Sequence, residues 1–322
     1  MSDLASQCGA LRDGMGYCDL SGRTQIELTG EDRSKVLHGL CTNDINRLTS
    51  GDGSEAFLTN VQGKTTGYVN VFCREASLVI DTAPGLAGEI IPALDRYVIR
   101  EDVKLVDRTN DWAEVLVSGS QASGLLASHF VGSMPDSRIG ISDGTIAHVQ
   151  VQLRCLPYTS PECFFLCCDL SHRSSIVAWL RQTDAIECDQ EAVNVARIEM
   201  GIPIYGQDVT VDNLPQELAR DELAISFTKG CYLGQETVAR IDALGHVNRR
   251  LLGLKFSGET VPPPGTGIAV DGKQVAEITS SCFSPRLEAP LALAFVRQGS
   301  SKPGTILQCP LGEAEVVDLP MR

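Results

Sequence analysis

The pattern of apolar residues changes late in the chain, and this change constrains the fold more than any other feature of the sequence. Before residue 249, runs with the period of a β-strand alternate with segments that have the period of an α-helix. From Leu251 onward, short apolar runs follow one another with turn residues between them. We therefore predict a mixed α and β region at residues 1–248 and an all-β module at residues 249–322.

The first region contains strands and helices in mixed order. Residues 24–28 alternate as a strand does and end at Gly30, after which Glu31 and Asp32 precede apolar residues at helical spacing. Acidic residues are favourable at a helix N-terminus because they complement the helix dipole. The fold class is therefore α+β. Further strands are predicted at 56–58, 68–72, 77–81, 114–118, 146–153 and 164–168, and helices at 86–98, 174–182 and 191–200.

The second region has the turn signals of a small barrel or sandwich. The dipeptide Asp271-Gly272 separates two apolar runs and predicts a tight β-hairpin. A run of three prolines before Gly265 is interpreted as a rigid turn inside this module. Further strands are predicted at 292–296, 305–308 and 314–317.

Charge and hydropathy exclude several classes of partner. Acidic residues outnumber basic ones by 41 to 27, which gives a formal net charge of −14 at pH 7. A field of this sign repels nucleic-acid phosphates and anionic lipids, so we predict no direct nucleic-acid partner and no membrane partner. Residues 1–20 hold Arg12 as their one basic residue and lack a long apolar stretch, so we expect a cytoplasmic protein. The acidic balance favours a monomer.

The chain contains 12 cysteines, whose spacing decides between a metal site, a disulfide scaffold and buried thiols. No C-x-x-C occurs, and the cluster of Cys163, Cys167 and Cys168 lies in an apolar run typical of a buried strand. We therefore predict no metal site, and without a secretory signal we expect no disulfide scaffold. A cysteine with a function must be identified by its local context.

Cys231 has such a context. Lys229 lies two residues before it, glycines flank it, and residues 235–244 are predicted as a helix ended by Gly245. A cysteine just before a helix N-terminus and near an ammonium group ionises readily to the thiolate, which is the nucleophilic form. The alternative interpretation is a cysteine buried in a structured turn.

Glu199 stands in the last turn of the predicted helix 191–200, where a carboxylate opposes the helix dipole. Such an unfavourable position fits a residue that binds hydrogen-bond donors on a ligand. The alternative is a solvated side chain or an ion pair with the nearby Arg197.

Arg240 belongs to a local group of basic residues in this acidic protein, together with His246, Arg249 and Arg250. A group of this kind can hold the anionic tail of a ligand. The alternative is a solvated charged face.

Residues 229–236 read Lys-Gly-Cys-Tyr-Leu-Gly-Gln-Glu and resemble the K-G-C-Y-x-G-Q-E signature of YgfZ-type folate-binding proteins, relatives of the aminomethyltransferase (T-protein) of the glycine cleavage system. Further segments of these proteins are resembled by residues 19–21, 26–30, 42–44, 197–203 and 205–206. The resemblance implies an aminomethyltransferase-like fold, with two α+β subdomains around a central cavity and a C-terminal β-barrel at 249–322.

The resemblance also implies a ligand, tetrahydrofolate or a one-carbon derivative, and assigns candidate residues to it. Glu199 falls at the carboxylate that holds the pterin ring, and Asp81 falls near a pterin-contacting asparagine of the aminomethyltransferases. The candidate ligand-binding residues are Glu199, Arg197, Asp81, Tyr68 and Arg240. The candidate catalytic residues are Cys231, Lys229 to favour its thiolate, and Gln235 and Glu236 to orient the loop.

The sequence departs from the aminomethyltransferases at Tyr68. These enzymes resemble N-E-x-G-G-x-x-D-D in this segment, and Tyr68 occupies the register of the second aspartate, the acid near the folate N5. No carboxylate occurs between Glu55 and Glu75. General acid catalysis raises a reaction rate about 10²–10⁴-fold. The loss of this acid therefore argues against efficient aminomethyl transfer and leaves open whether the protein is an enzyme.

We therefore expect, from the resemblance, a tetrahydrofolate-binding protein that supports assembly or repair of iron–sulfur clusters in other enzymes. Its expected partners are iron–sulfur enzymes or assembly proteins, with radical tRNA-modifying enzymes among the clients. Nucleophile, redox and cluster-ligand roles for Cys231 stay open. One alternative is an aminomethyltransferase that transfers a one-carbon unit to tetrahydrofolate, and another is a folate-binding scaffold in which Cys231 only packs.

Overall fold

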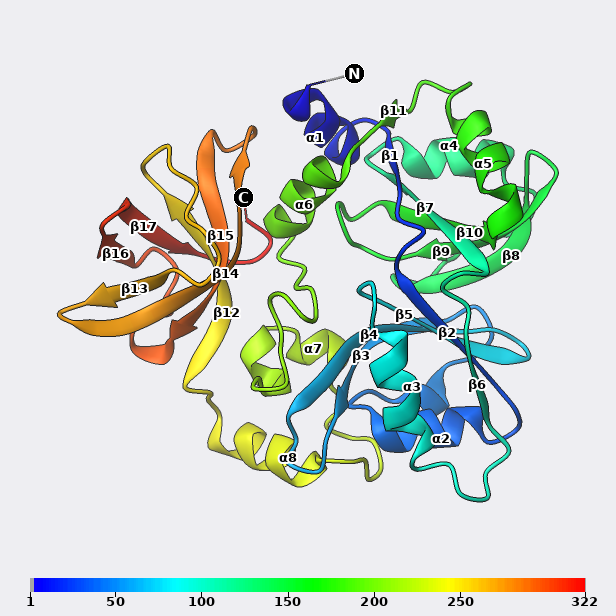
Figure 1. Ribbon diagram of the computed structural model, residues 1–322, viewed down its shortest axis with the longest axis horizontal. Coiled ribbons are helices and arrows are strands. Elements are labelled where there is room, and N and C mark those ends of the chain that lie inside the picture. Colours follow the sequence, from blue (N-terminus) through cyan, green and yellow to red (C-terminus); the bar gives the residue numbers. More distant parts are fainter. Residues whose placement is uncertain (1–2, 322) are drawn as a thin grey trace.

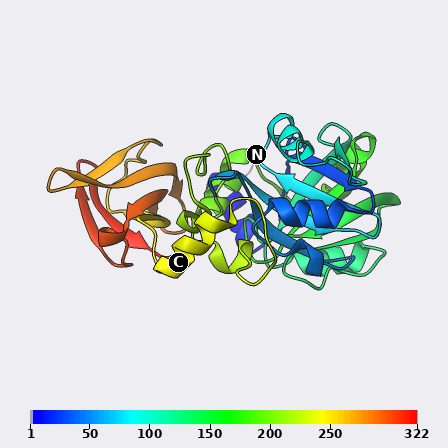
Figure 2. The same ribbon diagram turned by 90° about the horizontal axis from the view of Figure 1, so that it is seen from below.

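The computed structural model describes residues 3–321, so the outer limits of the predicted domains, residues 1 and 322, lie outside it. Within this range the strands form one five-stranded and two six-stranded sheets. Each sheet is the centre of one lobe, with the C-terminal β-module at the left of Figure 1 and two α+β lobes at the right. Figure 2 shows the β-module at one end of an elongated molecule. The predicted α+β fold class is confirmed.

The first α+β lobe is built on the sheet ordered β3-β4-β5-β2-β6. Its middle strands are buried along almost their whole length because α2 and α3 pack on one face, through Leu37 and Ile90 among others (Figure 1). The elements of this lobe are β2 (Thr24–Thr29), α2 (Arg33–Leu40), η1 (Ile45–Arg47), β3 (Gly53–Thr59), β4 (Thr65–Cys73), β5 (Ser77–Thr82), α3 (Ala87–Asp95) and β6 (Lys104–Asp107).

The second α+β lobe is built on the sheet ordered β11-β1-β7-β10-β9-β8. Because β1 precedes β2 and β7 follows β6, the chain passes twice between the two lobes. Its elements are α1 (Leu4–Arg12), β1 (Gly16–Asp19), β7 (Trp112–Ser118), α4 (Ala122–His129), β8 (Gly140–Ile146), β9 (Val149–Cys155), β10 (Cys163–Asp169), η2 (Leu170–His172), α5 (Arg173–Leu180), β11 (Ile186–Glu187) and α6 (Gln190–Glu199).

One strand predicted in this lobe is wrong, because the structure has two strands in its place. The single strand expected at residues 146–153 is a hairpin, in which β8 ends at Ile146 and β9 begins at Val149. Ala147 and His148 form its turn with φ of 49° and 66°. Neither residue is the asparagine, aspartate or glycine typical of such two-residue turns, so the sequence gives no strong hairpin signal here.

The C-terminal module is a nearly closed barrel ordered β13-β14-β15-β12-β17-β16. The hairpin predicted at Asp271-Gly272 is confirmed, with φ of 51° and 75° at these residues. The helix predicted at 235–244 is α8 (Gln235–Leu244), and it ends at Gly245 as expected. The other elements are η3 (Pro215–Leu218), α7 (Asp221–Ala224), β12 (Arg249–Phe256), β13 (Gly267–Val270), β14 (Lys273–Ser284), β15 (Ala289–Arg297), η4 (Gln298–Ser300), β16 (Ile306–Cys309) and β17 (Gly312–Val317). Among the helices of residues 3–321, none is long and apolar enough to cross a membrane.

Helix α6 joins the second lobe to the barrel, as its central place in Figure 1 shows. Its Arg197 is fully buried and donates from Nη1 to Asp208 at 2.6 Å and from Nη2 to Ser280 of β14 at 2.7 Å. A buried charge is tolerated because it is paired and hydrogen-bonded. The Arg197 pair therefore fixes the barrel against the helix that precedes it.

We predict that Arg197→Met lowers the free energy of unfolding by about 3–5 kcal/mol, because it leaves Asp208 buried without its cation. Arg181→Met is the control, since Arg181 pairs with Glu187 on the surface and such pairs contribute about 0–1 kcal/mol. Urea unfolding of both variants measures the difference. Equal losses would show that the Arg197 pair does not fix the barrel.

Candidate functional site

Two cavities adjoin one another where the two α+β lobes meet α6 and the segment that follows it. The larger has a volume of about 570 Å³ and the smaller about 30 Å³. Both cavities are lined by Arg23, Tyr158 and Ile204. We therefore treat them as one central site, which these three side chains divide into two parts. The larger is also lined by Leu20, Gly22, Pro84, Gln190, Glu191, Val193, Asn194, Arg197 and Gln207, and the smaller by Glu55, Tyr68, Asn70, Thr82, Ala83, Leu156, Pro157, Ile202, Pro203 and Tyr205.

Arg23 is the cation at the centre of this site. It lies in the short link between β1 and β2, and only 8% of its surface is exposed. Its guanidinium stacks over the rings of Tyr158 at 5.2 Å and Phe165 at 5.6 Å. Sequence reasoning missed Arg23. The available signal was an arginine directly before a buried strand, a position that requires a buried carboxylate partner.

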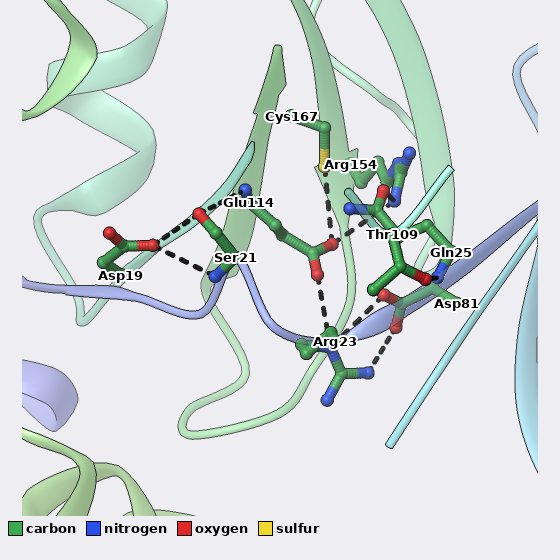
Figure 3. A network of polar contacts seen from close by, with 9 residues as sticks. All are labelled: Asp19, Ser21, Arg23, Gln25, Asp81, Thr109, Glu114, Arg154 and Cys167. Atoms are coloured by element: carbon green, nitrogen blue, oxygen red, sulfur yellow. Dashed lines mark hydrogen bonds and ion pairs between the residues drawn. The ribbon is translucent and has the colours of Figure 1, made fainter. Parts of the chain in front are cut away.

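That partner is Asp81 of β5, which binds the Arg23 guanidinium through both of its oxygens (Figure 3). Glu114 of β7 also contacts Arg23, at 3.3 Å from Nε. On its other side Glu114 accepts from Arg154 at 3.3 Å and from the Cys167 thiol at 3.4 Å. This buried network joins strands of both α+β lobes and orients Arg23 toward the cavity.

Glu114 is the unusual member of the network. Burial, together with the charge of Asp81, raises its pKa to about 8, against the lowering effect of Arg23 and Arg154. A glutamate in the unfolded chain loses its proton near pH 4.3. The folded protein therefore holds a proton on Glu114 across a range in which the unfolded chain does not.

We predict that the contribution of Glu114 to the free energy of unfolding falls with rising pH between about pH 5 and pH 8, because Glu114 keeps a proton in the folded state there that the unfolded chain has lost. Glu114→Gln removes this proton and makes the slope less negative by roughly 1 kcal/mol per pH unit. Urea unfolding at several pH values checks this, with the exposed Glu75→Gln as control. Parallel pH curves for wild type and Glu114→Gln would contradict the account.

Tyr68 lies at the smaller cavity, and its hydroxyl donates to Glu55 of the neighbouring strand β3 at 2.7 Å. Arg220 donates to the same carboxylate from Nε at 2.7 Å, and Arg138 donates to it at 3.2 Å. Burial would raise the pKa of Glu55, but Arg220 and these hydrogen bonds hold it below its usual range. Burial raises the pKa of Tyr68 well above its ordinary value. Tyr68 is therefore a fixed donor beside an ionised carboxylate.

Sequence reasoning missed Glu55 because it searched for an acid within the segment that ends at Tyr68. The pairing of β3 with β4 brings Glu55 close to Tyr68, although they lie 13 positions apart along the chain. Glu55 pairs with Asn70, so its side chain is a diagonal neighbour of Tyr68 on the same face of the sheet.

Lys229 has a different position from the one expected. Its ammonium donates to three backbone carbonyls at the end of α2 and beyond it, those of His38 at 2.5 Å, Cys41 at 2.7 Å and Asn43 at 2.9 Å. An ammonium group has three N–H donors, so all of them are used. Lys229 therefore fixes the loop to α2, and its ammonium is not directed at the Cys231 thiol.

Cys231 is the one exposed cysteine among residues 3–321, which rules out the alternative of a thiol buried in a turn. The helix that follows begins with Gln235 and carries Glu236 exposed in its first turn. Gly234 precedes it with φ of 80° and packs on Asn60, where a Cβ would lie 2.4 Å from the backbone oxygen, so the loop requires glycine there. Within the described residues no group of three or more His, Cys, Asp and Glu side chains is placed to hold a metal ion.

The structure does not bring the other candidate residues together. Glu199 accepts from Ser284 at 2.5 Å and from Arg286 at 3.0 Å, because the last turn of α6 faces the barrel, and it lines neither cavity. Asp81 lies behind Arg23, and Arg240 is exposed on α8 away from both cavities. Arg197 lines the larger cavity but is committed to Asp208.

The larger cavity offers both apolar and polar contacts to a ligand. Leu20, Val193 and the ring of Tyr158 offer apolar contact, and the guanidinium of Arg23 is presented at the dividing wall. Asn194 and Gln207 add side-chain amides, which can both donate and accept hydrogen bonds. Its volume of about 570 Å³ lies within the usual range of small-molecule sites.

We predict that Lys229→Met lowers the free energy of unfolding by about 2–4 kcal/mol, because it leaves three carbonyls without their charged donor. Lys64→Met is the matched control, since half-buried Lys64 makes a single such bond, to the backbone oxygen of Asp212. Urea unfolding of the two variants compares them. A loss at Lys229 no larger than at Lys64 would show that the ammonium does not fix the loop.

Comparison with known proteins agrees with the fold. Residues 2–229 match the family model of the GCVT N-terminal domain, and residues 249–321 match that of the glycine cleavage T-protein C-terminal barrel domain. The chain therefore belongs to the glycine cleavage T-protein family.

Curated relatives include the aminomethyltransferase of Nostoc sp., 26% identical over 318 residues that cover 95% of this chain and 83% of the relative. The aminomethyltransferase of Streptomyces avermitilis is 24% identical over 306 residues, which cover 92% and 82% of the two chains. Among solved structures, the glycine cleavage system aminomethyltransferase T from Bartonella henselae superposes with a TM-score of 0.83 at 18% identity, over 98% of this chain and 89% of that one. At this identity the likeness shows the fold.

Proposed function

We propose that the protein binds tetrahydrofolate or a one-carbon derivative in the cavity at Arg23, and that it supports assembly or repair of iron–sulfur clusters through Cys231. The observation that carries the proposal is the hydrogen bond from Tyr68 to Glu55. Tyr68 stands at the position where the aminomethyltransferase pattern has its second aspartate. Glu55 is ionised and held by Arg220, and Tyr68 is a buried phenol of raised pKa. Neither group is suited to supply a proton near neutral pH, so this site favours binding over transfer.

The thiol loop supports the second half of the proposal. Cys231 is exposed, whereas the thiols of Cys18, Cys188 and Cys282 have pKa values raised to about 12, mainly by burial. An exposed thiol can reach a protein partner, and a buried one cannot. The iron–sulfur role and the expected clients, among them radical tRNA-modifying enzymes, follow from the likeness of residues 229–236 to the YgfZ-type signature.

An aminomethyltransferase is the second candidate, and the names of the curated relatives favour it. It requires a one-carbon unit on a carrier-protein lipoyl arm and a proton donor at the folate. Formation of methylenetetrahydrofolate from such a carrier measures this activity directly. We expect no turnover above the reaction without protein, and robust turnover would support the second candidate instead.

Rescue of an iron–sulfur enzyme in cells that lack their own YgfZ-type protein tests the proposal. We expect wild type to restore the enzyme's activity and Cys231→Ser at equal abundance to fail, because serine cannot replace a thiolate. Cys309→Ser is the matched control, since Cys309 is half-buried in barrel strand β16 and we expect it to rescue fully. Equal rescue by Cys231→Ser would remove the thiol from the proposed function.

A further inference from the structure

The loop that carries Cys231 is bound at both ends to the last turn of α2. Before the cysteine, the Lys229 ammonium donates to the backbone oxygen of His38. After it, the backbone N–H of Leu233 donates to the backbone oxygen of Gly39 at 2.9 Å. Two adjacent residues of α2 therefore hold the loop on both sides of Cys231, which places the thiol-bearing residue beside His38.

The imidazole of His38 faces this loop. A Cβ placed on Gly230, the residue before Cys231, would lie 3.9 Å from His38 Nε2, and apart from Gly230 and its two chain neighbours no other atom lies within 4 Å of it. On the opposite edge of the ring, Nδ1 lies 3.2 Å from Asp44 Oδ1. The side chains of His38 and Asp44 are only 13% and 14% exposed, and Asp44 is held in place by Arg47 at 3.0 Å.

We propose that His38 is the proton acceptor for the Cys231 thiol, with Asp44 as the positioning residue that orients the imidazole. This inference rests on the proposed function in taking Cys231 as the reactive thiol. In the step, the S–H bond of Cys231 breaks and its proton binds His38 Nε2, which leaves a thiolate and an imidazolium. The Asp44 carboxylate lies 3.2 Å from Nδ1, so its charge favours the tautomer that carries its proton on Nδ1 and leaves Nε2 free, and it stabilises the imidazolium.

The charges around His38 suit an acceptor. Burial lowers its pKa, and so does the Lys229 ammonium, against the raising effect of Asp44. The ring is therefore neutral near pH 7 and its Nε2 can take a proton. The neighbouring Cys41 thiol, which faces Lys229, has its pKa raised to about 11 by burial and adds no charge. Arg47 acts on the ring only through Asp44.

Site-resolved alkylation tests the proposal. Iodoacetamide reacts with intact protein between pH 6 and pH 10, and mass spectrometry of the peptide that holds Cys231 gives its rate apart from those of the other cysteines. The variants are His38→Gln and Asp44→Asn. The control is His172→Gln, at an exposed histidine just before α5.

We expect His38→Gln to lower the alkylation rate at pH 7 about threefold and to leave the rate at pH 10 unchanged. The acceptor acts only where the thiol still carries its proton, whereas at pH 10 the thiolate forms without it. Asp44→Asn is expected to shift the profile in the same direction, and His172→Gln is expected to leave it unchanged.

An unshifted profile in folded His38→Gln would overturn the proposal, because a merely structural role of His38 does not move a pH profile. If His38→Gln does not fold, Asp44→Asn decides in the same way. The outcome is separable from that of the proposed function. A shifted profile together with full rescue of the iron–sulfur enzyme by Cys231→Ser would keep the proton transfer and refute the cellular role.

Discussion

Two buried arginines and two buried carboxylates stand where the two α+β lobes meet, and the central site depends on them. Removing such groups from water is costly unless each charge is paired or hydrogen-bonded. Arg23 meets that requirement through Asp81 of β5, and Glu114, which keeps its proton near neutral pH, contacts Arg23 and accepts from Arg154 in the sheet of the second lobe (Figure 3). The link between β1 and β2 is thereby fixed in one conformation, which presents the Arg23 guanidinium to both cavities.

Asn43 connects the smaller cavity to the loop of Cys231 through its side chain and its backbone. The Asn43 amide donates to the backbone oxygen of Glu55 at 2.8 Å and to that of Leu223 at 2.9 Å, while its own backbone oxygen accepts from Lys229. Glu55 lines the smaller cavity, and Lys229 holds the loop of Cys231. A chain of hydrogen bonds thus connects the smaller cavity to the loop of Cys231, and Lys229 belongs to this chain.

The sequence was sufficient for features encoded by neighbouring residues. The limits of α8 follow from helical spacing between Gly234 and Gly245, and the barrel hairpin follows from Asp271-Gly272. The turn at Ala147 escaped prediction because its positive φ is enforced by the pairing of β8 with β9, not by a turn-forming residue.

The site was less predictable because side-chain direction depends on tertiary packing. Glu199 ends α6 as expected, but the helix turns that carboxylate toward Ser284 and Arg286 of the barrel. Arg23 and Glu55 gained their positions from strand pairing between distant segments, which spacing along the chain does not reveal. Local sequence context identified the loop of Cys231, but only the structure showed where Lys229 points.

Equilibrium binding of tetrahydrofolate to the intact protein tests the central claim most directly. Wild type and Cys231→Ser are predicted to bind equally, because the thiol loop lies outside the cavity lining. Arg23→Gln is predicted to bind at least about tenfold more weakly, a loss of about 1.4 kcal/mol, since it removes the cation at the dividing wall. Absence of binding to wild type, or equal binding by folded Arg23→Gln, would contradict the account.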